Sequence, residues 1–154
     1  AGPDEVVVYG ANRLLVTGGG SGGARLVRAS AAGAEPVARF SDGCCLQGVV
    51  DIDGVRSAVI VDEAFERVTV IAGGGEQTTA DLPDGTHVVR LFGDTLFVLV
   101  DDSVEALAVP DLERRWEADL DTRPRSIQSI SESAISVTDG DTATLLVDGP
   151  AADR

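Results

Sequence analysis

Short runs of alternating apolar and polar residues recur along this chain, separated by turns rich in Gly and Asp. In four places one shape returns: an apolar strand ends in Val followed by Thr or Asp, a turn intervenes, and a second apolar strand follows. The four segments are LLVTGGGSGGARLV (Leu14–Val27), VIVDEAFERVTVI (Val59–Ile71), VLVDDSVEALAV (Val98–Val109) and ISVTDGDTATLLV (Ile135–Val147). Their enrichment in Val and Ile predicts strands rather than helices.

These segments return at a period of about 40 residues, which is typical of a repeat architecture. The valines that end the first strand of each segment are Val16, Val61, Val100 and Val137, at separations of 45, 39 and 37 residues. Each repeat is expected to hold four short strands. Those of the second repeat are expected at Leu46–Ile52, Arg56–Val61, Arg67–Ile71 and Thr78–Leu82. Those of the third are expected at Val88–Phe92, Thr95–Val100, Val104–Val109 and Arg114–Leu120.

A unit of about 40 residues with four strands has the size of a β-propeller blade, and the chain resembles the β-propeller repeat superfamily over nearly its whole length. The resemblance is to blade size and strand rhythm. The Trp-Asp dipeptide of the WD40 class is absent, since Trp116 is followed by Glu117. The resemblance implies one all-β, propeller-like domain over residues 1–154, with repeats at about 6–40, 44–82, 86–120 and 125–150. A β-sandwich or open barrel is the alternative architecture.

The fourth repeat is short, because only DGPAADR follows Val147. The missing strand could come from the N-terminal segment DEVVVYG, from a partner chain, or from sequence beyond these residues. The chain is therefore either a small ring or a fragment of a larger protein. The incomplete repeat is also the reason to expect self-association as a homodimer.

Charge narrows the classes of partner. The 154 residues carry a net charge of −14, and all 12 basic residues are Arg. Nucleic acid and anionic membrane surfaces are both disfavoured, because each requires a basic protein surface. No apolar run approaches the roughly 20 residues of a membrane-spanning helix. The sequence leaves the location of the protein open, with an extracytoplasmic one slightly favoured.

The segment TGGGSGG matches the pattern Gly-x-Gly-x-x-Gly and resembles the glycine-rich turn of short-chain dehydrogenases. That resemblance implies a Rossmann-type enzyme fragment that binds a nucleotide at Gly18–Gly23, with a helix in the residues that follow. The catalytic Tyr and Lys of that family are missing, because Tyr9 precedes the glycines and the chain has no Lys. Aligned with the other repeats, the glycines occupy a hairpin turn. We therefore expect Gly18, Gly20 and Ser21 to form a flexible turn that a partner can approach closely, with nucleotide binding as the alternative.

Cys44, Cys45 and His87 form a candidate metal or redox site. His87 takes the place of Cys45 when the repeats are aligned, so neighbouring repeats could bring the three side chains to one rim. Thiolate and imidazole suit Zn or Cu. Adjacent side chains of a strand point to opposite faces, however, so two buried thiols without a metal are the preferred interpretation. A vicinal disulfide is a further alternative.

Few side chains are arranged for catalysis. His87 would be the only imidazole base, and no pair of carboxylates is singled out, although carboxylates recur at equivalent turns as Asp62, Asp101 and Asp139. Trp116 is the best single candidate anchor for a partner, although a core position on an outer strand is the preferred interpretation. We therefore predict a protein that is not an enzyme and needs no cofactor. It would be a β-repeat binding or assembly module, a scaffold or sensor, that contacts a protein partner or a second copy of itself.

Overall fold

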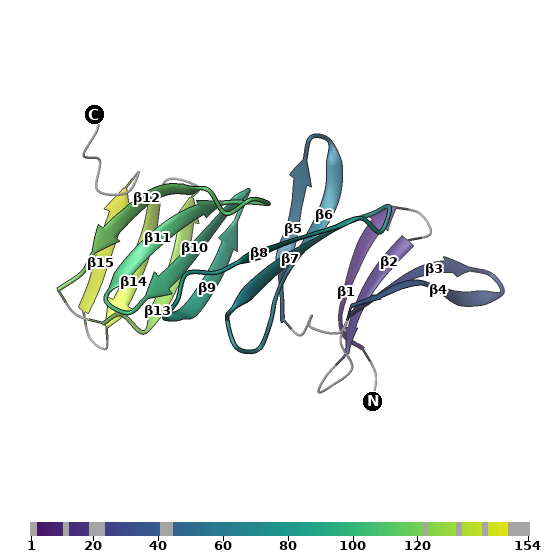
Figure 1. Ribbon diagram of the computed structural model, residues 1–154, viewed down its shortest axis with the longest axis horizontal. Helices are drawn as coiled ribbons and strands as arrows, with labels where there is room; N and C mark the ends of the chain where they lie inside the picture. The colour runs from purple at the N-terminus through teal and green to yellow at the C-terminus, as the bar shows by residue number, and fades with distance from the viewer. Residues whose placement is uncertain are drawn as a thin grey trace. The chain divides into compact units, whose positions relative to one another are not determined.

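The computed structural model describes residues 3–10, 13–18, 24–40, 45–121, 123–131, 134–139 and 142–147, and side chains within residues 27–36, 46–121, 123–128, 134–139 and 143–144. These residues form β-strands connected by turns (Figure 1). None of the described segments is a helix that could span a membrane. The strands are β1 (Pro3–Gly10), β2 (Arg13–Gly18), β3 (Ala24–Ser30), β4 (Gly33–Phe40), β5 (Cys45–Ile52), β6 (Val55–Val61), β7 (Arg67–Ala72), β8 (Gln77–Asp81), β9 (Thr86–Phe92), β10 (Thr95–Val100), β11 (Ser103–Ala108), β12 (Arg114–Asp119), β13 (Ser126–Ser131), β14 (Ala134–Asp139) and β15 (Thr142–Val147).

The strands form four antiparallel sheets, each built from consecutive strands (Figure 1). Sheets β1–β4, β5–β8 and β9–β12 have four strands, and sheet β13–β15 has three. Every strand pairs with its neighbour in sequence, so each sheet is a meander. The predicted all-β repeat fold is confirmed. The strands predicted for the second and third repeats coincide with β5–β8 and β9–β12 and differ only at their ends.

The first sheet corrects two expectations. β1 pairs with β2, with Val6 opposite Val16, so the N-terminal segment completes its own sheet and does not supply the strand missing from the fourth repeat. The residues after the glycine-rich segment form β3 and β4, which pair with each other. The helix of the Rossmann-type alternative is therefore wrong. The physical reason is the turn between these strands, where Ser30 Oγ accepts a hydrogen bond from Ala32 N and Gly33 adopts a φ of +125°, a value that favours glycine.

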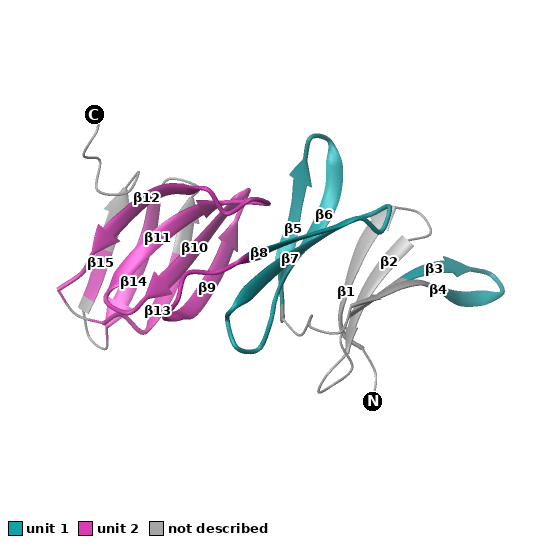
Figure 2. Cartoon of the chain, viewed as in Figure 1, with its two compact units in different colours: residues 1–80 teal, residues 81–154 magenta. Residues whose placement is uncertain are grey.

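The chain divides into two compact units, residues 1–80 and 81–154 (Figure 2). In unit 1, β6 is buried over five consecutive residues, Ser57–Val61. Successive side chains of a strand point to opposite faces of its sheet. Both faces of this sheet are therefore covered at β6, which is why the strand is a continuous apolar run rather than an alternating one.

In unit 2, an apolar cluster joins sheet β9–β12 to sheet β13–β15. Phe97 is fully buried in it, and its ring centroid lies 6.0 Å from that of Trp116, with the rings tilted by 49°. The buried members of the cluster are Phe97, Leu99, Val104, Ala106, Ala118, Ile127, Ile135 and Val137. Because they come from both sheets, the two sheets of this unit pack face to face and hold their connecting loops in fixed positions.

Candidate binding site at one end of unit 2

Four loops and strand ends meet at one end of unit 2, which we call the pocket end. They are the loop before β9, the β10–β11 turn, the loop before β13 and the end of β14. Asp101 N, in the β10–β11 turn, donates a hydrogen bond to Gly85 O in the loop before β9 (3.4 Å), and Arg125 N donates one to Thr138 O (2.7 Å). The opposite, far end holds the β9–β10 and β11–β12 turns, which are linked by a hydrogen bond from Val109 N to Asp94 O (3.0 Å).

Gly85 allows the close approach of the first two loops. Its φ is +86°, and a Cβ at this position would lie 3.0 Å from Oδ2 of Asp101. A side chain here would strain the backbone, and the Asp101 carboxylate would have to move by a few tenths of an ångström. The φ of Gly85 therefore favours glycine at this position of the pocket end.

A β-bulge at the start of β9 directs His87 away from the strand. Thr86 lies opposite Val100 and Val88 lies opposite Leu99, so His87 has no partner in the ladder. A bulge of this kind turns the extra side chain out of its expected direction. Cys45 lies opposite Val61, as Thr86 lies opposite Val100. Cys45 therefore shares its ladder position with Thr86 rather than with His87.

The imidazole of His87 connects the loops that precede β9 and β13. Its Nε2 lies 3.1 Å from Pro124 O, and its Nδ1 lies 3.4 Å from Gly85 O. In the neutral ring only one nitrogen can donate, and Nε2 makes the shorter contact. Both ring nitrogens face backbone carbonyls, and His87 thereby links the loop before β9 to the loop before β13.

A pocket of about 540 Å³ opens to solvent between these loops. Pro124 is buried, while the side chains of Arg123 and Arg125 are exposed and that of Asp139 is half-buried. Its lining residues are His87, Val88, Arg123, Pro124, Arg125 and Asp139. In the part of the chain that the structure describes, neither arginine forms an ion pair. Both arginines therefore line the pocket without a described carboxylate partner.

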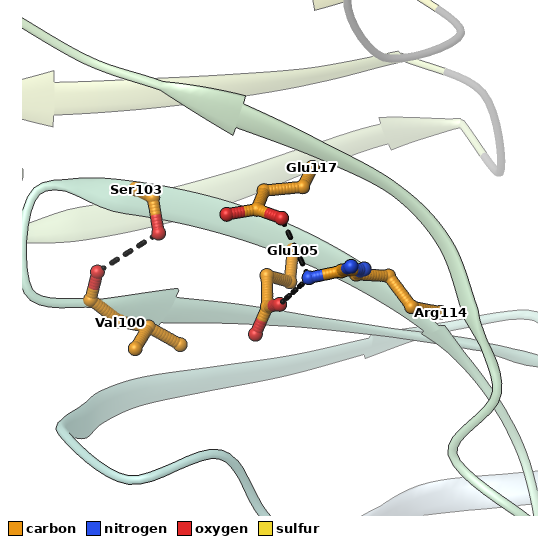
Figure 3. Close-up of polar contacts among 5 residues, drawn as sticks. All are labelled: Val100, Ser103, Glu105, Arg114 and Glu117. Carbon is orange, nitrogen blue, oxygen red and sulfur yellow. Dashed lines mark hydrogen bonds and ion pairs between the residues drawn. The ribbon is translucent and has the colours of Figure 1, made fainter.

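A second polar cluster lies on β11 and β12 (Figure 3). Arg114 Nη1 donates hydrogen bonds to Glu105 Oε1 (3.0 Å) and Glu117 Oε2 (2.6 Å). The hydrogen bond to Glu105 raises the pKa of the Arg114 guanidinium above its usual value, and the charges of both carboxylates add to the effect. Glu105 is buried, and its Oε2 has no hydrogen-bond partner among the described residues. The cluster is thus an incompletely satisfied buried carboxylate with a partly exposed counter-ion.

Arg115 lies in a second β-bulge, in β12, and stabilises the far end of unit 2. Arg115 is skipped in the pairing of β11 with β12. Its two Nη atoms donate to the two carboxylate oxygens of Asp94, each at 2.9 Å, and Nη1 also donates to Thr95 Oγ1. The hydrogen bond from Arg115 lowers the pKa of Asp94 below its usual value of 3.8. This ion pair joins the β9–β10 turn to the outer strand of the same sheet.

The residues singled out from sequence have different outcomes. Gly20, Ser21 and Cys44 lie outside the described residues, and so does the side chain of Cys45, although its backbone begins β5. Gly18 is the last residue of β2. The Cys-Cys-His site stays a prediction. Within the described ranges no group of three or more His, Cys, Asp or Glu side chains could hold a metal ion.

Trp116 and Asp62, one of the recurring turn carboxylates, both make contacts within the fold. The indole is half-buried and packs against the apolar cluster of unit 2, in line with the preferred interpretation of Trp116 as a core residue. Asp62 Oδ1 accepts hydrogen bonds from the backbone N of Glu66 and Arg67, both at 2.8 Å, and so shapes its own turn. The pocket-lining arginines that sequence reasoning did not single out are Arg123 and Arg125.

The chain is similar to several solved structures. Kluyveromyces lactis Hsv2 matches over 99% of this chain and 51% of its own length, at 13% identity and a TM-score of 0.64. BBS1N in complex with ARL6DN matches over 94% of this chain and 51% of its own, at 16% identity and a TM-score of 0.60. The N-terminal domain of Nup159 matches over 94% and 43%, at 15% identity and a TM-score of 0.62. These are β-propeller domains. The chain has a propeller-type fold.

The likeness is to part of a propeller, because the chain spans about half the length of these structures. At such low identity it shows the fold alone. No family model and no curated protein matches the chain. In propeller terms, β9 and β13 are the first strands of adjacent blades, and the pocket lies where these two blades begin.

Proposed function

We propose that this chain is a non-catalytic propeller module that binds a protein partner through the pocket end of unit 2. The observation that carries the proposal is the pocket beside Arg123 and Arg125, whose loops are linked by the contact of His87 with Pro124 O between the two sheets and by backbone hydrogen bonds within each sheet. The one histidine supports a binding role rather than catalysis. Both nitrogens of His87 face carbonyl oxygens, so neither is aimed into the pocket as a base would be.

The charges around the pocket favour a partner with a basic surface. Exposed or half-buried carboxylates surround the two arginines on the loops of this end: Asp84, Asp101, Asp102, Asp121 and Asp139. A surface of one sign speeds association with a partner of the other sign and excludes partners of its own. BBS1N, a similar propeller, is itself in a complex with the protein ARL6DN, which supports a protein as the kind of partner.

A matched pair of charge reversals tests this proposal. Asp102→Arg changes the pocket end, and Glu113→Arg makes the same change of charge in the β11–β12 turn at the far end; both residues are exposed. We expect affinity capture from cells that make the protein, read by mass spectrometry, to recover a partner with the wild type and Glu113→Arg. Recovery with Asp102→Arg should fall about tenfold or more, as for a charge in an interface. Equal recovery by all three proteins, or no partner at all, would contradict the proposal.

We also propose that two copies of the chain associate, with the four sheets as consecutive blades of one repeat domain over residues 1–154. Two observations support this. β15 pairs only with β14 among the described strands, which leaves one backbone edge of that sheet without a described partner. The chain also spans about half of each similar propeller, so two copies together match the length of one ring.

Solution mass tests the association directly. We expect light scattering coupled to size exclusion to give twice the 15.9 kDa of one chain. Hydrogen exchange should show all amides of β15 protected, because an added strand would pair those that face away from β14. A strict monomer in which alternate β15 amides exchange freely would refute the dimer and leave the binding proposal standing.

A further inference from the structure

The segment Arg123–Arg125 is held rigidly at the edge of the pocket. Pro124 is buried, and its carbonyl oxygen lies 3.1 Å from His87 Nε2. One residue later, Arg125 N donates to Thr138 O at 2.7 Å. The residue before a proline is restricted to extended conformations, which describes Arg123. The backbone that carries both arginines is therefore fixed before any ligand arrives.

This backbone presents the two arginines as a pair. Residues at i and i+2 of an extended segment lie on one side, about 6.5 to 7 Å apart. Both side chains line the same pocket. They differ from Arg114 and Arg115, whose guanidinium groups are bound to Glu105, Glu117 and Asp94 in the same unit. The chain has a net charge of −14, yet these two neighbouring arginines have no described carboxylate partner. They are therefore suited to bind an anionic group of a ligand.

We propose that this pocket binds two acidic side chains of an extended segment of the protein partner, spaced two residues apart, one on each arginine. The inference rests on the proposed function and names the chemistry recognised at the same site. An extended peptide places its i and i+2 side chains on one side, so that two of its carboxylates can face the two arginines that line this pocket. A guanidinium and a carboxylate form two parallel hydrogen bonds, which fix orientation as well as charge.

The surroundings of the pocket determine what must flank the acidic pair. Asp139 lines the pocket itself, and Asp101 and Asp102 lie on the adjacent turn. A uniformly acidic segment would be repelled by these carboxylates, whereas lysines on either side of the acidic pair would be attracted to them. The recognised segment therefore has acidic residues at i and i+2 between basic residues.

Peptide binding to the full chain tests this inference. The probe is acetyl-Lys-Lys-Asp-Ala-Asp-Lys-Lys-amide, and the comparison peptides replace Asp-Ala-Asp by Asn-Ala-Asn or by Asp-Asp-Ala. Binding is measured by calorimetry at 0.15 M salt, where charges beyond about 8 Å are screened and close contacts are retained. Amide shifts in NMR spectra locate the site. The protein variants are Arg123→Gln/Arg125→Gln and, as a matched control, Arg56→Gln/Arg67→Gln, which removes two exposed arginines from unit 1.

We expect the probe to bind the wild type and the control within about twofold of each other, and the pocket variant about tenfold or more weakly. The Asn peptide should lose about as much, and the Asp-Asp-Ala peptide should bind less tightly than the probe. The inference is overturned if the Asn peptide binds equally or if the pocket variant binds like wild type. It is also overturned if inorganic phosphate alone shifts the Arg125 and Asp139 amides while the peptide does not. A partner that is captured in an Asp102-dependent way would still support the proposed function in each of these cases.

Discussion

Replacing Glu105 by Leu should leave unit 2 at least as stable as before and stabilise it by about 1 kcal/mol. The Glu105 side chain is 10% exposed, and its Oε2 has no hydrogen-bond partner among the described residues. Burying an unsatisfied oxygen costs about 1 to 3 kcal/mol. The bond to Arg114 returns less than this, because the Arg114 side chain is 55% exposed and water competes for its donors. Leucine has a similar volume and buries apolar surface instead.

Arg114→Leu should have the opposite sign and destabilise the protein. It would leave Glu105 buried without its counter-ion, and it would remove the cation that separates Glu105 from Glu117 in the pairing of β11 with β12. Glu117→Leu serves as the matched control on the exposed partner, whose side chain is 41% exposed. It should change stability by less than about 0.5 kcal/mol.

Urea denaturation followed by the fluorescence of Trp116, the single tryptophan, measures all three variants. A gain of 1 kcal/mol corresponds to a rise in Tm of about 2 to 4 °C for a chain of this size, which thermal melting can confirm. The reasoning is refuted if Glu105→Leu lowers the free energy of unfolding by more than about 1 kcal/mol, or if it and Arg114→Leu are destabilising to the same extent.

Three further substitutions test the packing, the ion pair and the close approach. Phe97→Ala should cost about 3 to 5 kcal/mol, because the ring is fully buried, and should shift native Trp116 emission to longer wavelength; an unchanged urea midpoint would contradict this. Asp94→Asn should cost about 0.5 to 1 kcal/mol at pH 7. Since the ion pair lowers the pKa of Asp94 below 3.8, its stabilisation is present above that pH, so the difference in Tm from wild type should shrink as the pH falls below it; a difference that grows there would be inconsistent. Gly54→Ala should cost about 1 kcal/mol for its φ of +78° alone, and Gly85→Ala more, because only there would Cβ meet a carboxylate; equal losses in urea denaturation would count against the contact.

The repeat and its strands were predictable because the burial of each strand determines the pattern of apolar and polar residues in its sequence. A strand with one covered face alternates, and one with two covered faces is a continuous apolar run, as β6 is at Ala58–Val61. The bulges were not predictable. The extra residue in a bulge depends on which partner residues the strand pairs with, and His87 and Arg115 carry no local signal of being skipped.

The candidate site was harder to predict than the fold, because its residues are distant in sequence and lie together only in the folded protein. His87 and Pro124 are 37 residues apart and meet only when two blades pack together. The one signal in the sequence was Arg-Pro-Arg in an otherwise acidic chain, in the loop equivalent to those that hold Asp42-Gly43 and Asp84-Gly85 in earlier repeats. A rigid proline between two positive charges is an unusual loop for a chain of net charge −14. Its significance depended on the pocket around it.

Because each sheet is built from consecutive strands, ordering one sheet closes only short loops of chain. Short closures cost little entropy and form quickly. The β9–β12 meander, with its continuously buried central strands, is therefore expected to fold early and to serve as the surface on which β13–β15 orders. Since each sheet is one continuous stretch of chain, a whole sheet can be gained or lost by duplication or deletion without changing the strand connections of the others. In such a lineage, the junction of two adjacent blades that forms the pocket could be copied as a unit.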